Sequence, residues 1–154
     1  MSELNNQIAE IEVSYKPQMK ILNQQMINTS NKAFDIFKDL FNDSTIAMQE
    51  EFVVLYLNRS NKPLGTYRAS KGGVAGTYVD IKIIMATALK SLASSIIVCH
   101  NHPSGSITPS EQDKLVTEKL NNACKMFDIN LVDHLIITPQ NDYYSFTDGG
   151  LLTK

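Results

Sequence analysis

The chain has 154 residues, of which 43% are hydrophobic, and a formal net charge of −2 at pH 7. This length and apolar content are sufficient for one globular domain with a buried core. Because nucleic-acid binders usually carry a basic surplus or patch, we expect no strong nucleic-acid binding. No apolar run approaches the length of a membrane span, and the N-terminus lacks the apolar segment of a signal peptide. We therefore expect a cytoplasmic protein without a membrane segment.

The chain is expected to divide into an N-terminal extension, residues 1–27, and a single domain, residues 28–154. Within the extension, residues 8–15 partly alternate apolar and polar side chains, which is consistent with an edge strand. Residues 31–41 repeat apolar side chains at helical spacing and predict a helix.

The domain contains more predicted strands than predicted helices. Residues 50–58 are apolar on both faces, which indicates a strand in the interior of a sheet. Apolar periodicity predicts further strands over 64–70, 95–100, 130–138 and 142–146, and helices over 81–93 and 109–127. The expected buried stripes of the two helices are Ile81, Ile83, Ile84, Ala86, Leu89, Leu92 and Ala93, and Leu115, Val116, Leu120, Ala123 and Phe127. Because the strands and helices do not strictly alternate, we expect an α/β or α+β fold, with a mixed β-sheet flanked by helices.

Two histidines stand at the end of the apolar strand 95–100. Residues i and i+2 of an extended segment point to the same side, so His100 and His102 should face one point in space while Asn101 faces away. Pro103 and Gly105 then end the strand. A His-x-His pair is by itself a weak sign of a metal site, and a third ligand must come from elsewhere in the chain.

A helix start comes shortly after this pair. Thr108 is the expected N-cap, with Pro109 at the first helical position and Glu111 three residues after the cap, as in a capping box. On that helix Asp113 lies one turn from Ser110, on the same face.

Two imidazoles and a carboxylate at such a strand–loop–helix turn would supply three N/O ligands. Three protein ligands with a fourth position open to water are typical of catalytic zinc sites. We therefore expect one Zn²⁺ per chain, held by His100, His102 and Asp113.

The order His-x-His-Pro and then Ser-x-x-Asp resembles the signature of the JAMM/MPN+ zinc metalloproteases. The segments 100–105 and 108–110 are similar, more narrowly, to the RadC branch of that family, and the resemblance covers roughly residues 28–153. It implies a JAB/MPN fold, of the cytidine-deaminase-like type, with zinc between a strand and a helix. Longer relatives carry an N-terminal helix-hairpin-helix region, which we expect this chain to be too short to hold.

The resemblance also implies a zinc metallopeptidase or isopeptidase that hydrolyses an amide bond with a zinc-activated water. The family uses a glutamate before its first central strand as general base, and both Glu50 and Glu51 are candidates. Strand alternation sends them to opposite faces, but both faces are apolar, so periodicity does not choose between them. Alignment of residues 52–58 with the family strand favours Glu50. In the same pattern Ser110 helps to hold the oxyanion.

Two further points stay open at the level of sequence. His134 lies in an apolar strand, where a hydrogen-bonded core histidine is favoured over a fourth ligand. The alternative function is a non-proteolytic, DNA-repair-associated accessory protein with a structural or vestigial metal site, and a metal-dependent nuclease is a weaker third option. The ligand set together with Glu50 and Ser110 favours the peptidase, whose peptide or protein substrate and oligomeric state the sequence does not identify.

Overall fold

The protein is described by a computed structural model that covers residues 8–16, 25–71 and 78–153. The elements in chain order are α1 (Ser30–Leu40), β1 (Glu51–Leu57), β2 (Pro63–Lys71), α2 (Ile81–Lys90), β3 (Ser95–Asn101), α3 (Glu111–Met126), β4 (Asn130–Ile137) and β5 (Tyr143–Ser145). The strands form one sheet in the order β2-β1-β3-β4-β5, in which β3 and β4 are parallel and the other neighbours antiparallel. The expected α/β class with a mixed sheet and flanking helices is confirmed.

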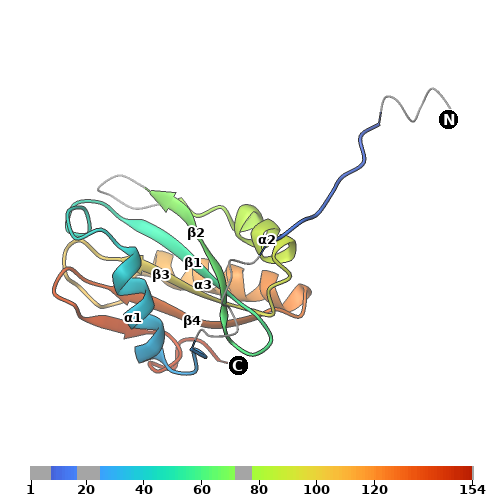
Figure 1. Ribbon diagram of the computed structural model, residues 1–154. Helices are drawn as coiled ribbons and strands as arrows, with labels where there is room; N and C mark the ends of the chain where they lie inside the picture. The colour runs from blue at the N-terminus through green and yellow to red at the C-terminus, as the bar shows by residue number, and fades with distance from the viewer. Residues whose placement is uncertain (1–7, 17–24, 72–77, 154) are drawn as a thin grey trace.

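Helices cover both faces of the sheet (Figure 1). On one face α1 contributes Ala33 and Phe37 to a core that also contains Phe41. On the other face α2 and α3 share a core that includes Ile84 and Leu120. The sheet is therefore buried on both sides, which explains the nearly continuous apolar runs of its interior strands.

Every residue of β1 is buried, as expected for an interior strand. Its side chains alternate between the two cores: Phe52, Val54 and Tyr56 face α2 and α3, and Val53, Leu55 and Leu57 face α1. In the antiparallel register between β1 and β3, Phe52 lies opposite His100. The even-numbered residues of β1 and β3 therefore share the face covered by α2 and α3.

The expected apolar stripes of α2 and α3 were partly wrong. On α2, Ile83 and Leu89 are exposed, and Leu92, which comes after the helix, is 81% exposed. On α3, Leu115 and Phe127 are about half exposed, whereas the buried residues are Thr117, Leu120 and Cys124. These three share a helical face because they are three and four residues apart. The buried face of α3 thus includes a polar residue, Thr117, whose side chain contacts the buried His134 of β4.

Residues 8–15 do not form the expected edge strand. Residues 8–16 pair with none of the described strands and run away from the body of the molecule (Figure 1). The side chains of Ile8, Ile11 and Val13 are exposed, so the apolar residues of this segment do not pack on the sheet. Near its end, the hydroxyl of Tyr15 donates to the Leu64 carbonyl at 2.5 Å.

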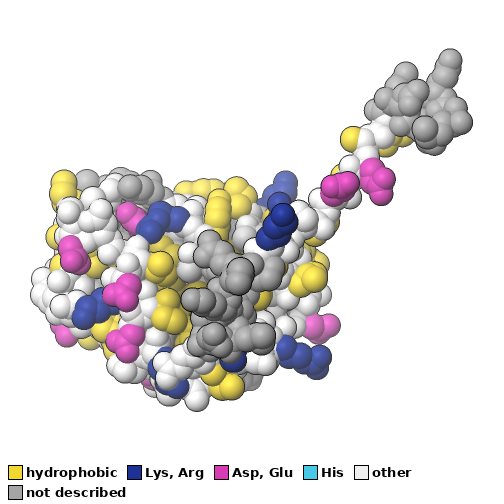
Figure 2. Space-filling view, in the orientation of Figure 1, with side chains coloured by type: hydrophobic (Ala, Val, Ile, Leu, Met, Phe, Trp, Pro, Cys, Tyr) yellow, Lys and Arg dark blue, Asp and Glu magenta, His cyan; other side chains and the backbone are white. Residues whose placement is uncertain are grey.

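Within the described ranges, no helix is long and apolar enough to cross a membrane. The face of the molecule shown in Figure 2 carries Lys and Arg side chains interspersed with Asp and Glu side chains, and no patch of one sign is visible on it.

Candidate metal centre

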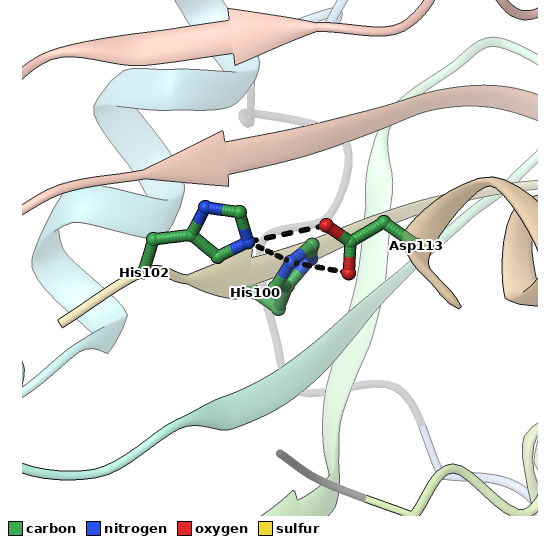
Figure 3. A group of neighbouring side chains, drawn as sticks. All are labelled: His100, His102 and Asp113. Atoms are coloured by element: carbon green, nitrogen blue, oxygen red, sulfur yellow. Dashed lines mark hydrogen bonds and ion pairs between the residues drawn. The ribbon is translucent and has the colours of Figure 1, made fainter. Parts of the chain in front are cut away.

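The end of β3 presents both histidines on the side of the sheet that α3 covers. His100 lies within the strand, and His102 comes directly after it. The backbone N–H of His102 still donates to the Ile137 carbonyl of β4 at 2.9 Å, so the chain keeps its extended course past the last strand residue. The imidazoles consequently converge, as the i, i+2 spacing predicts (Figure 3). Asn101 points to the opposite side, where its side chain bonds to Ile46 and Gln49.

The helix that brings in the carboxylate begins later than expected. Ser110, not Thr108, is the N-cap of α3: its Oγ accepts the Asp113 N–H at 3.0 Å, and its own N–H donates to Asp113 Oδ2 at 2.8 Å. Thr108 and Glu111 have the same spacing, so local sequence rules alone allow either cap. Only the observed cap holds the Asp113 carboxylate in the first turn, beside the histidines.

Three candidate ligand side chains converge between β3 and α3 (Figure 3). Nε2 of His100 lies 2.9 Å from Nε2 of His102 and 3.1 Å from Oδ1 of Asp113. Nε2 of His102 lies 3.2 Å from Oδ2 of Asp113. Tetrahedral ligands at zinc distances of about 2.0–2.1 Å are separated by about 3.3 Å. With one ligand atom taken from each side chain, the three atoms lie within 4.8 Å of one another. The group is therefore compatible with a metal site of this size.

The electrostatics of the site favour an ionised carboxylate. Burial by itself raises the pKa of Asp113, but the contacts of its carboxylate with the His100 and His102 rings and with the Ser110 N–H outweigh this effect and hold the pKa well below its usual range. The hydrogen bond to Asp113 is the largest cause that raises the pKa of His102, and the charge of Glu50 adds to it. The N-terminus of α3 also favours a negative charge at Asp113.

A third histidine stands directly behind the first ligand. His134 is fully buried, and burial lowers its pKa well below the usual value, which favours the neutral ring. Its Nε2 lies 2.7 Å from Nδ1 of His100, and its Nδ1 lies 2.6 Å from Oγ1 of Thr117. The ring stacks on Phe146 with centroids 4.5 Å apart. The arrangement is that of a hydrogen-bonded core histidine, as favoured from the sequence.

His102 is oriented in a similar way. Its Nδ1 lies 2.7 Å from the backbone carbonyl oxygen of Ser106, which can only accept, so Nδ1 donates, and in the neutral ring the lone pair is on Nε2, the atom that a metal would bind. Such an outer hydrogen bond is the usual partner of a metal-binding histidine.

The ligand atoms line a cleft of about 700 Å³. Glu50 and Ser110 line the same cleft, and Phe52, Val79 and Val116 contribute apolar wall. All five candidate site residues are thus brought together in one cavity. A partly apolar cleft with a few converging polar groups is the usual form of a binding site for a small ligand or a reacting group of a substrate.

Glu50 and Glu51 lie on opposite faces of the sheet. Glu51 is buried on the face of α1, where it pairs with Arg68. Glu50 lies on the face of the imidazoles and lines the cleft. The register of β1 against β3, with Phe52 opposite His100, explains this outcome, which apolar periodicity alone did not determine.

Asn101 is a structural residue whose role the sequence analysis missed. Its side chain is fully buried; Oδ1 accepts the Glu51 N–H at 2.7 Å, and Nδ2 donates to the carbonyls of Ile46 and Gln49 at 2.8 and 2.9 Å. It therefore ties the strand that bears the histidines to the segment that leads into Glu50. The sequence did contain a sign of this role: Asn101 is an amide in an apolar strand, and a buried amide needs hydrogen-bond partners.

Comparison with known proteins agrees with this geometry. A family model described as a RadC-like JAB domain matches residues 27–151. A UPF0758 protein of Flavobacterium johnsoniae is 43% identical over 131 residues, which make up 85% of this chain and 56% of that relative. A UPF0758 protein of Porphyromonas gingivalis is 39% identical over 94% of this chain and 63% of its own length. The chain thus spans less than two thirds of the length of these curated relatives. It belongs to the RadC-like JAB domain family.

Proposed function

We propose that this protein is a zinc-dependent hydrolase that cleaves an amide bond in a peptide or protein, including the isopeptide bond of a modified lysine. The observation that carries the proposal is the convergence of His100, His102 and Asp113 in a cleft that Glu50 and Ser110 also line. A purely structural metal site would be closed by four protein ligands and would need neither a base nor an oxyanion donor beside it.

The three ligands would hold zinc through two imidazole nitrogens and one carboxylate oxygen. When bound, zinc supplies a Lewis acid and lowers the pKa of its water to about 7. The remaining chemistry falls to side chains of this chain, because amide hydrolysis also needs proton transfer and stabilisation of the developing charge.

Glu50 is the proposed general base. Its carboxylate accepts a proton from the attacking water as the new C–O bond forms at the substrate carbonyl. It then returns this proton to the amide nitrogen as the C–N bond breaks, so that the products are a carboxylate and an amine. Its place on the cleft wall, on the face of the imidazoles, supports this role.

Ser110 is the proposed oxyanion donor. Its Oγ already accepts the Asp113 N–H, which occupies an oxygen lone pair and leaves the hydroxyl hydrogen for another partner. Since Ser110 also lines the cleft, this hydrogen can be donated to the oxygen of a tetrahedral intermediate.

The test is a search for cleavage products in a cell lysate. Zinc-loaded wild-type protein should generate new peptide termini or newly freed lysine amines, and the Glu50→Gln variant, loaded in the same way, should not. Products that appear equally with both proteins would come from a contaminant. No products with either protein would favour the non-proteolytic accessory protein instead.

A further inference from the structure

We infer that Thr117 and His134 are positioning residues that keep His100 in the Nδ1–H tautomer, with Nε2 free to bind the metal. This inference rests on the proposed metal site and adds to it two residues, from α3 and β4, that contact no metal. The observations behind it are three consecutive buried contacts, in which each donor has a single hydrogen to give.

The first residue in this series of contacts is Thr117. Its hydroxyl donates to the backbone carbonyl of Asp113 at 2.6 Å, one turn earlier in α3. A hydroxyl has a single hydrogen, so towards its other neighbour Oγ1 can only accept. That neighbour is Nδ1 of His134, at 2.6 Å. His134 therefore carries its hydrogen on Nδ1.

The next contact determines which nitrogen of His100 carries the hydrogen. A neutral imidazole has one N–H, so Nε2 of His134 is an acceptor. It lies 2.7 Å from Nδ1 of His100, which must then be the donor. His100 is left with an unprotonated Nε2, and this is the atom that faces His102 and Asp113. Each hydrogen bond in the series thus determines the next, from the hydroxyl of Thr117 to the metal position.

Burial makes this series sensitive to a single hydroxyl. Thr117 is 3% exposed and His134 is fully buried, so water cannot easily replace a lost partner. Without the acceptor at Thr117, His134 would gain by moving its hydrogen to Nε2 and donating towards His100. His100 would then carry its own hydrogen on Nε2, where it blocks the metal position.

This series of hydrogen bonds from Thr117 through His134 to His100, which we call the relay, also explains why α3 buries a threonine. Thr117 shares the buried face of the helix with Leu120 and Cys124 and meets β4 at His134. It receives its orientation from the carbonyl of Asp113, whose carboxylate is a ligand at the other end of the relay. The hydrogen bonds therefore connect the helix and the strand that together form the site.

The experiment is zinc affinity measured by competition with a chromophoric chelator. Outer hydrogen-bond partners of metal-binding histidines are typically worth about 10–100-fold in affinity. Thr117→Val, which keeps the shape but removes the hydroxyl, should weaken zinc binding on that scale, whereas Thr117→Ser should stay close to wild type. His134→Phe should weaken binding as well. Phe146→Leu is the control, because it disturbs the packing of the His134 ring without removing a hydrogen bond.

A second measurement reads the tautomers directly. Nitrogen-15 NMR of the zinc-loaded wild type should show His100 and His134 both protonated at Nδ1 and unprotonated at Nε2. Unchanged affinity in Thr117→Val, or a His134 ring protonated at Nε2, would overturn the relay while the metal site stands. A wild-type chain that binds no zinc would overturn the metal site and the relay together.

Discussion

Ser110 and Asp113 bind each other twice across the first turn of α3, with each backbone N–H donating to the other's side chain. The carboxylate that completes the candidate metal site is thus also part of a helix cap. The Ser110 hydroxyl therefore contributes to folding, a role that the cap expected at Thr108 did not require.

Ser110→Ala should lower the free energy of unfolding by about 1 kcal/mol, since it removes an N-cap side chain. It should also lower kcat by about 10²–10³-fold, as loss of an oxyanion donor does. Ser110→Gly separates the two effects, because glycine at an N-cap costs only a few tenths of a kcal/mol. Denaturant unfolding and turnover are the measurements. A fully active glycine variant would leave Ser110 with the cap alone.

Glu50→Gln should keep zinc and stability and lower turnover by about 10²–10⁴-fold, because it removes only the proton carrier. Glu51→Gln should show the opposite pattern. It weakens a buried carboxylate's pairing with Arg68 and should cost about 1–3 kcal/mol of stability, with turnover retained. Parallel measurements of zinc content, unfolding and turnover on both variants decide this. Loss of turnover in the Glu51 variant alone would transfer the role of base to that residue.

Asn101→Ala should lower turnover with zinc retained, because it frees the segment that leads into Glu50. It also leaves three backbone groups without their partner, at a cost of about 1–3 kcal/mol. Asn58→Ala is the matched control: this asparagine accepts from the N–H groups of Ser60 and Lys62 at the opposite end of β1. The control should lose stability with turnover unchanged. Equal turnover in both variants would contradict a positioning role for Asn101.

Asp133 supplies a pH-dependent term in stability. Burial raises its pKa, although Ser145, Thr147 and the His134 N–H donate to its carboxylate. The unfolded chain therefore releases this proton first, from about pH 3.9, and the stability contributed by Asp133 is lost as pH rises through the folded pKa.

Asp133→Asn lacks this titration. In the presence of a chelator, the unfolding free energy of the wild type should fall relative to that of the variant between about pH 4 and the folded pKa. Chemical unfolding at several pH values measures the difference. Parallel pH curves for the two proteins would contradict the shift.

The features that the sequence predicted well depend on short-range rules. The i, i+2 spacing of His100 and His102 in an extended strand determines their common side, whatever the rest of the fold. The apolar runs of interior strands likewise indicated β1 and β3. Both depend on a few consecutive residues.

The features that it predicted poorly depend on how distant elements meet. Two overlapping capping boxes were available, and only contact with the histidines distinguishes the cap at Ser110. The buried face of α3 contains Thr117, which contacts His134 of β4, and leaves Leu115 exposed. The choice of Glu50 over Glu51 needed the register of β1 on β3. None of these relations is contained in local periodicity.

The binding of one zinc ion by His100, His102 and Asp113 underlies the whole proposed mechanism. The most direct measurement is the metal content of dialysed protein by mass spectrometry, for the wild type, His102→Ala and Asp113→Asn. Asp113→Asn keeps an acceptor for the Ser110 N–H, so it tests the ligand rather than the cap, and Glu111→Gln in the same turn is the control. We predict one zinc per chain in the wild type and the control, and little in the two ligand variants. A full equivalent of zinc in either ligand variant, or none in the wild type, would contradict this assignment.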